Sequence, residues 1–204
     1  MDEIKKKYQI IYADPPWEYD SARSIARQSC LSGELQKPYL YMPIEDICKL
    51  PIKDIADDNS LLFMWVTAPK LNLAFQVFPA WGYEYSTVAF VWEKLRVNPG
   101  YYTLSSCEFV LVGRKGNIPK PRGIRNAEQF YQEERTTHSK KPDGIRDLIH
   151  EMFPSQTKIE LFARQKTEGW TSIGNDIDGI DIKESLDKKG VYKRKHSNSL
   201  LAVQ

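Results

Sequence analysis

The segment Asp14-Pro15-Pro16-Trp17 combines residue types that can hold a planar amine for reaction. It follows a short apolar run, residues 9–13, which predicts a buried strand that the two prolines bring to an end. The prolines stiffen the backbone, so the Asp14 carboxylate and the Pro15 carbonyl can face one crevice together. Two acceptors side by side match an NH2 group, which carries two N–H donors. The Trp17 ring adds a surface on which a planar base can stack.

This arrangement suits transfer of a methyl group to the exocyclic amine of adenine. That nitrogen is a poor nucleophile because its lone pair is delocalised into the ring. Hydrogen bonds from both N–H groups would localise the lone pair, so the amine could attack a methyl donor in line, without a covalent enzyme intermediate. By chance, Asp-Pro-Pro-Trp would occur in fewer than roughly one in a thousand chains of this length. We therefore interpret the motif as functional, and not only as a turn that ends a strand.

The rest of the chain alternates apolar runs with amphipathic segments. The patterns predict strands at residues 61–66, 83–92, 108–112, 157–163 and 170–173, and helices at 42–47, 71–79 and 141–153. Strands that are apolar on both faces and alternate with helices indicate a mostly parallel sheet with helices on both faces, an α/β Rossmann-like fold. Ligands of such sheets bind beyond the carboxyl ends of the strands, which is where Asp14 is expected. The long polar segment 18–40 is a candidate substrate-gating loop.

Length and composition fit one soluble domain. The chain has 204 residues, of which 41% are hydrophobic and 27% charged, and its net charge of +2 is too small to indicate a polyanionic partner. Three cysteines without paired spacing, and three histidines without ligand spacing, argue against a disulfide framework and against a metal site. We find no membrane-spanning run and no signal peptide, so we expect a cytoplasmic location, or the host cytoplasm for a viral protein.

The composition changes near residue 181. From there the sequence is polar, and residues 188–195 form a basic run. We therefore expect a catalytic domain over residues 1–180 and a flexible basic tail over residues 181–204.

From Tyr8 to Gly179 the chain resembles the MT-A70 family of adenine-N6 methyltransferases. The resemblance implies a class I fold that depends on S-adenosylmethionine, with the catalytic motif before the cofactor motif. The matching stretches are residues 13–17, 41–47, 62–67, 141–143, 159–164, 169–170 and 174–175.

The resemblance also implies a set of cofactor contacts. Lys141 should meet the methionine carboxylate of S-adenosylmethionine, and Asp14 should lie near its amino group. The residues expected along its ribose and adenine are Glu160, Arg164, Asn175 and Asp176. Two departures stand out: Ala163 occupies a position where the family usually has glycine, and only 13 residues precede Asp14, where longer relatives carry an upstream strand and an acidic residue. The second departure predicts weaker cofactor binding or a partner that completes the pocket.

The nucleic-acid side is less specific. Two basic segments flank the expected site: residues 114–125, which contain glycine and proline, and residues 135–141, which lead into Pro142. Basic loops of this kind contact phosphates, and the target base must be flipped from a duplex or offered on a single strand. By resemblance, Trp65 and Glu108 help to form the adenine pocket. The cations expected to bind the substrate are Lys120, Arg122, Arg125 and Lys140.

Three alternatives stay open. The chain is compact and has no added RNA-binding module, which favours DNA over RNA adenosine as the substrate. A catalytically silent subunit that binds nucleic acid is disfavoured, because silent relatives lose the Asp-Pro-Pro-Trp motif. The chain could act as a homodimer or as a heterodimer with a related subunit.

Overall fold

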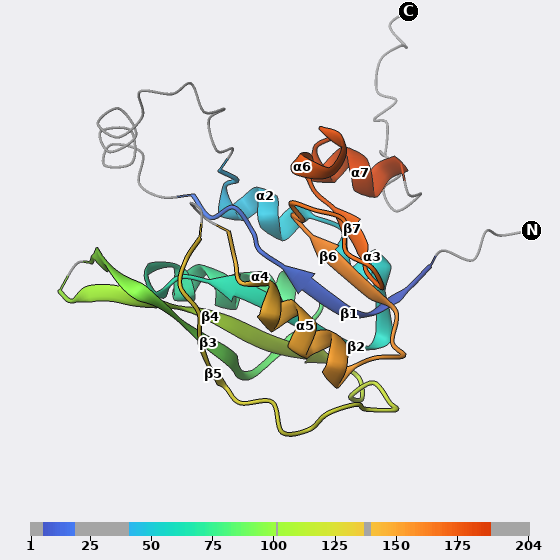
Figure 1. Cartoon of the computed structure of the whole chain (residues 1–204). Helices are drawn as coiled ribbons and strands as arrows, with labels where there is room; N and C mark the ends of the chain where they lie inside the picture. The colour runs from blue at the N-terminus through green and yellow to red at the C-terminus, as the bar shows by residue number, and fades with distance from the viewer. Residues whose placement is uncertain (1–5, 19–40, 101, 137–139, 189–204) are drawn as a thin grey trace, which may run out of the picture.

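A computed structural model of the chain describes residues 6–18, 41–100, 102–136 and 140–188 (Figure 1). Its seven strands form one sheet in the order β5-β3-β4-β2-β1-β6-β7. The strands are β1 (Tyr8–Ala13), β2 (Ala56–Val66), β3 (Glu84–Pro99), β4 (Leu104–Lys115), β5 (Phe130–Gln132), β6 (Lys158–Leu161) and β7 (Thr171–Ile173). Only β4 is antiparallel to its neighbours; the other four pairings are parallel. The prediction of a mostly parallel sheet is confirmed.

Helices cover both faces of this sheet, as predicted. They are α2 (Ile44–Lys49), α3 (Ile52–Ile55), the 3-10 helix η1 (Ala68–Lys70), α4 (Leu71–Ala80), α5 (Asp143–Met152), α6 (Asn175–Asp178) and α7 (Ile182–Lys188). Side chains of β1 alternate between two cores. Ile11 and Ala13 pack with α2, α3, α4 and α7, whereas Ile10 and Tyr12 pack with α5 on the other face. β1 is therefore buried on both faces, which explains its uninterrupted apolar sequence.

The position of β1 creates a crevice at its carboxyl end. β1 lies between β2 and β6 and is parallel to both. The chain reaches β2 through α2 and α3 on one face and reaches β6 through α5 on the other. Where the connections of two neighbouring parallel strands run over opposite faces of the sheet, a crevice opens beyond the carboxyl ends of those strands. This crevice is the usual ligand site of an open α/β sheet. Asp14 is the first residue after β1.

Packing continues past the expected end of the domain. Ile182 and Leu186, at 2% and 0% exposed, join the core that also holds α2 and α4. The boundary placed at residue 180 from the sequence is therefore too early, because two apolar residues one helical turn apart bury α7 against the domain. The rest of the basic tail and the candidate gating loop at 19–40 lie outside the described residues. The longest helices in the described ranges have 10 residues, too few to cross a bilayer.

Candidate active site

Four charged side chains from four segments meet at the carboxyl end of β1. Lys141, just before α5, places its Nζ 3.3 Å from Asp14 Oδ1 and 2.9 Å from Glu108 Oε2. Lys94 of β3 places its Nζ 3.4 Å from Glu108 Oε1. The four side chains are between 6% and 21% exposed, so water screens their interactions weakly. We refer to Asp14, Lys141, Glu108 and Lys94 as the charge chain.

The two carboxylates of the charge chain titrate differently. Burial raises the pKa of Asp14, Lys141 opposes the rise, and Glu108 adds to it. Burial also acts to raise the pKa of Glu108, but Lys141 and Lys94 together outweigh it and hold this pKa below its ordinary value. Burial would lower the pKa of Lys141, yet its two carboxylate neighbours raise it. Lys141 and Glu108 therefore stay charged at neutral pH, and Asp14 is the stronger base of the two carboxylates.

A cavity of about 250 Å³ opens beside the charge chain. Its lining residues are Tyr12, Asp14, Trp65, Lys140, Lys141, Pro142, Asp143, Arg146, Glu160, Phe162, Arg164 and Gln165. The polar groups fit S-adenosylmethionine, because Lys141 offers a cation to its carboxylate and Asp14 an anion to its ammonium group. The Glu160 carboxylate suits ribose hydroxyls. The cavity thus brings together most of the residues that the resemblance assigns to the cofactor.

Trp65 and Trp17 divide the aromatic roles. The Lys141 Nζ lies 5.4 Å from the centroid of the Trp65 ring, and the Trp65 indole N–H donates to the Tyr12 hydroxyl at 2.5 Å. Trp17 is 5% exposed, and its indole N–H donates to the Trp65 carbonyl at 3.0 Å. Trp65 thus forms part of the cavity wall. Trp17 anchors the turn at Asp14–Trp17 to the end of β2, a role other than the stacking surface expected from the sequence.

Backbone hydrogen bonds hold the turn at Asp14–Trp17 in place. The Trp17 N–H donates to the Pro15 carbonyl at 2.9 Å, and the Met42 N–H donates to the Pro16 carbonyl at 2.9 Å. Because a carbonyl oxygen has two lone pairs, the Pro15 carbonyl can accept a second hydrogen bond. Pro15 is buried and Pro16 half-buried, so the turn after β1 is fixed by packing as well as by the proline rings.

The turn after β6 accommodates Ala163 without narrowing the cavity. Ala163 is 2% exposed, and its N–H donates to the Ile173 carbonyl at 2.8 Å. Phe162 takes the left-handed conformation, with φ 61°, that this turn requires. A Cβ on Gly174 would lie 2.1 Å from the Ala163 carbonyl oxygen, so glycine is needed there for the two segments to pack. The alanine faces the core, and Phe162 and Arg164 face the cavity.

The last two residues expected at the cofactor, Asn175 and Asp176, lie away from the turn at Asp14–Trp17. They begin α6, directly after Gly174 at the carboxyl end of β7, and both are exposed. In the strand order, β7 is two positions from β1. The two residues share the edge of the sheet with Asp14 but do not line the cavity. Their contact with the cofactor stays a prediction.

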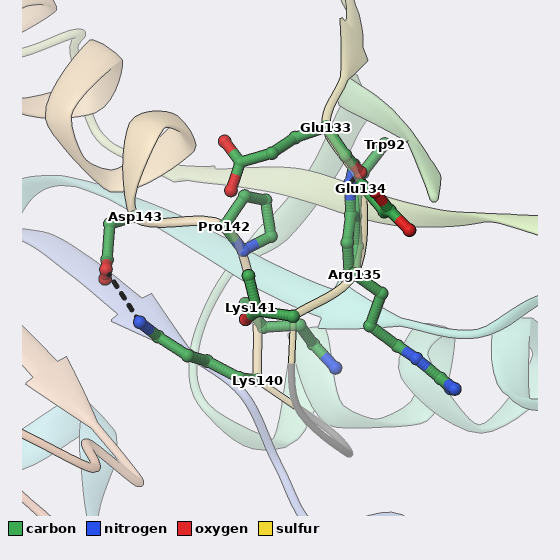
Figure 2. Close-up of a pocket in the computed structure, with 9 residues that line it drawn as sticks. Trp92, Glu133, Glu134, Arg135, Lys140, Lys141, Pro142 and Asp143 are labelled. Carbon is green, nitrogen blue, oxygen red and sulfur yellow. Dashed lines mark hydrogen bonds and ion pairs between the residues drawn. The ribbon is translucent and has the colours of Figure 1, made fainter. Parts of the chain in front are cut away.

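The neighbouring lysines at the start of α5 point in different directions (Figure 2). Lys140 Nζ lies 3.1 Å from Asp143 Oδ2, whereas Lys141 joins the charge chain. A small hollow between Lys141 and the segment after β5 is lined by Glu133, Arg135 and their neighbours. The basic segment that precedes α5 therefore does reach the site, as the sequence predicted.

The other basic segment does not reach the site. The Asn117 N–H donates to Asn59 Oδ1 at 2.9 Å near the start of β2, and the Gly123 N–H donates to the Met152 carbonyl at 2.9 Å in the last turn of α5. The loop that carries Lys120, Arg122 and Arg125 therefore lies at the opposite edge of the sheet from Asp14 (Figure 1). The prediction that it flanks the site is wrong, because β4 runs against the other strands and carries the chain away from the site.

Sequence reasoning missed four residues of the site: Tyr12, Lys94, Arg146 and Gln165. Tyr12 could have been predicted from the sequence. It lies two residues before Asp14 in an extended segment, so the two side chains point to the same face. Lys94 could not have been predicted, because a lysine beyond the predicted end of a strand resembles an ordinary surface residue.

Comparison with known proteins agrees with this geometry. The MT-A70 family model matches residues 8–176. The type II methyltransferase M.MunI of a Mycoplasma species is 42% identical over 193 residues, which are 87% of this chain and 83% of that protein. The N(6)-adenosine-methyltransferase catalytic subunit METTL3 of Homo sapiens is 28% identical over 212 residues, 98% of this chain but 33% of that protein. This chain thus spans about a third of METTL3 and most of the Mycoplasma protein. The match of the family model over most of the described fold shows that this chain belongs to the MT-A70 family.

Proposed function

We propose that this protein transfers the methyl group of S-adenosylmethionine to the N6 amine of adenine in nucleic acid, with DNA as the preferred substrate. The observation that carries the proposal is the position of Asp14. It directly follows β1 and lines the cavity, and Lys141 ties it to Glu108. An acceptor for the target amine and a binding site for the methyl donor therefore share one wall.

The chain itself supplies acceptors and a base. S-adenosylmethionine supplies an electrophilic methyl group on its sulfonium sulfur. Asp14 accepts one N–H of the target amine and the Pro15 carbonyl accepts the other, which localises the nitrogen lone pair. As the new N–C bond forms, the methyl–sulfur bond breaks and its electron pair stays on the sulfur, and the amine nitrogen must lose a proton. The raised pKa of Asp14 makes its carboxylate a suitable acceptor for that proton.

We assign the charge chain to the positioning of Lys141. Glu108 contacts Lys141 and Lys94 with different oxygens, so each lysine helps to keep this carboxylate ionised. An ionised Glu108 holds the Lys141 ammonium near Asp14, where it can meet the carboxylate of the methyl donor. Glu160, Arg164, Asn175 and Asp176 are assigned to the ribose and adenine side, and Trp65 to the face of the target base.

The choice of DNA rests on the relatives. Identity is 42% to the type II methyltransferase. It is only 28% to the N(6)-adenosine-methyltransferase catalytic subunit, whose name specifies adenosine, a ribonucleoside. The intact Asp14-Pro15-Pro16-Trp17 turn and the buried charge chain favour a catalytic subunit over a silent one. Burying four charges is costly, and a protein that only binds nucleic acid has no need of them at this place.

The test is methylation of matched oligonucleotides. DNA and RNA strands of the same sequence are incubated with isotopically labelled S-adenosylmethionine, digested, and analysed by nucleoside mass spectrometry. We expect labelled N6-methyldeoxyadenosine, and none with the Asp14→Asn variant. Label on RNA alone would change the substrate to RNA adenosine. Label on cytosine, or no label on any strand, would refute the proposal.

A further inference from the structure

The cavity wall made by α5 and β6 carries an ion network centred on Arg146, a residue to which the proposed function assigns no role. Arg146, in the first turn of α5, has a side chain that is 8% exposed. Its Nη1 lies 3.4 Å from Glu160 Oε2, and its Nη2 lies 2.7 Å from Asp143 Oδ1. Gln165 Nε2 also donates to Asp143 Oδ1, at 3.1 Å. Arg146 therefore joins the carboxylate expected at the ribose to the start of the helix that carries Lys141.

A guanidinium this deeply buried is costly unless anionic partners surround it. Arg146 has two such partners, and both line the cavity with it. A structural ion pair could lie anywhere between α5 and β6. This pair lies at the carboxyl end of β6, where Glu160 lines the cavity. Arg146 therefore affects the charge that Glu160 presents to a ligand of the cavity.

We propose that Arg146 is a positioning residue for cofactor binding, which holds Glu160 as an ionised and oriented carboxylate that accepts the ribose hydroxyls. This inference rests on the proposed function, since it takes S-adenosylmethionine as the ligand of the cavity. In this role Arg146 acts through Glu160, whose carboxylate it contacts, and the double variant below tests whether it also contacts the ligand.

The titration of Glu160 supports this role. Burial raises the pKa of Glu160 to about 7, Arg146 opposes the rise, and Asp143 and Asp14 add to it. The titratable and charged groups that face Glu160 are Arg146 and Asp143 from α5, Tyr12 and Asp14 from β1, and Arg164 from the turn after β6. Its register partner in β7 is Ser172, which does not titrate. Arg146 is thus the cation that keeps Glu160 partly ionised at neutral pH.

The sign of the expected pH dependence follows. If the ligand needs the ionised carboxylate, its affinity falls as the pH drops through the pKa of Glu160. With that pKa near 7, the dissociation constant should be about tenfold higher at pH 6 than at pH 8. Removing Arg146 raises the pKa of Glu160 further, which moves the midpoint of the profile to higher pH and weakens binding at pH 7.

The experiment is calorimetric titration of the full chain with S-adenosylhomocysteine between pH 5.5 and 8.5. The variants are Arg146→Met, Arg146→Lys, Glu160→Gln and the double variant Arg146→Met/Glu160→Gln. We expect Arg146→Met to shift the midpoint upward and Arg146→Lys, which keeps the charge, to shift it less. Glu160→Gln should remove the transition near pH 7. The double variant should bind no more weakly than Glu160→Gln alone, because Arg146 acts through Glu160.

A matched control is Arg114→Met, which removes an exposed cation paired with Glu84 at the far edge of the sheet. It should leave the profile unchanged. If Arg146→Met does not fold, as judged by circular dichroism, Arg146→Gln takes its place, because it removes the charge but keeps a polar side chain. A midpoint identical to that of the parent in the folded, uncharged variant would overturn the inference. A double variant that binds more weakly than Glu160→Gln would also overturn it. Absence of any binding by the parent chain would refute the proposed function itself.

Discussion

Two basic segments that look alike in sequence lie at opposite edges of this molecule. Residues 114–125 and 135–141 are both rich in cations, and each lies at or after the end of a strand. The second leads into α5 and delivers Lys141 to the charge chain. The first packs near the start of β2 and the last turn of α5. Both segments have the basic composition expected of a phosphate-binding loop. Only the direction of the strand before each segment determines which one reaches the site.

The two basic segments lie at opposite edges because one strand of the sheet, β4, is reversed. β4 is antiparallel to β2 and β3, so its carboxyl end lies at the edge opposite Asp14. β5 is parallel to β3, and its carboxyl end returns to the edge of the site. A chain that leaves β4 must therefore begin its next loop at the wrong edge for catalysis. We call these the site edge and the far edge, and each prediction tests this division.

The largest effect is expected from Asp14→Asn at the site edge. The amide is neutral and can present a donor to the target amine, so turnover should fall by at least about 100-fold. Asp58→Asn at the far edge, where Asp58 forms an exposed pair with Lys115, is the matched control and should leave turnover unchanged. Methyl transfer is measured under saturating cofactor. Near-normal turnover of a folded Asp14→Asn protein would remove Asp14 from the catalytic role.

A smaller effect is expected from Lys141→Met, measured as affinity for S-adenosylhomocysteine. Losing a charge-assisted contact should weaken binding by about 10- to 100-fold. Lys140→Met is the control next in the chain. It loses only a half-exposed pair with Asp143, so the expected loss is less than about threefold. Equal effects of the two substitutions would show that the charge chain does not select Lys141 for the cofactor.

Salt dependence of oligonucleotide binding sharpens the division further. Replacing Arg135 or Lys140, near the site, should each reduce the slope of log affinity against log salt by about 0.7 to 0.9. Replacing Lys120 or Arg125 at the far edge should leave that slope as it is. The opposite pattern would place the nucleic acid along the far edge, and would restore the phosphate role that the sequence indicated for that loop.

The smallest effect concerns Arg122, whose guanidinium lies 4.8 Å from the centroid of the Phe153 ring. Arg122→Ala should lower the free energy of unfolding by about 1 kcal/mol, the value of a partly buried cation–π contact. Lys120→Ala should change it by less than about 0.5 kcal/mol. Chemical denaturation measures both. Reduced methyl transfer by the folded Arg122→Ala protein would contradict a purely structural role.

The sequence and its resemblance to the family together placed Asp14, Lys141, Glu160 and Arg164 at one site, and all four line the cavity. β1 and β6 are apolar runs, and parallel strands end at one edge, so Asp14 and the segment after Glu160 had to meet there. Lys141 was expected there from the resemblance, in which the lysine precedes an amphipathic helix. The positions of these residues at one edge of the sheet agree with the geometry shared by all parallel sheets, and their roles in catalysis and cofactor binding stay predictions.

The remaining features depend on tertiary packing. The direction of β4 could not be predicted, since an apolar run has the same pattern in either direction. Lys94 became visible only because β3 continues to Pro99, beyond the predicted end of the strand at Trp92. Arg146 occupies a buried turn of α5 that its charge alone would assign to the surface. Lys94 and Arg146 are buried because each pairs with a carboxylate 14 residues farther along the chain, Glu108 and Glu160 respectively.

The left-handed backbone of Phe162 has a consequence for attempts to make this enzyme more thermostable. A residue other than glycine in this conformation costs about 1 to 2 kcal/mol, and such strain persists only where the surroundings enforce it. Phe162→Gly would relieve the strain, but it would also remove a ring that lines the cavity. Heat resistance and retention of the methyl donor therefore place opposite demands on this one position. Selection for one property alone should move residue 162 in the direction that harms the other.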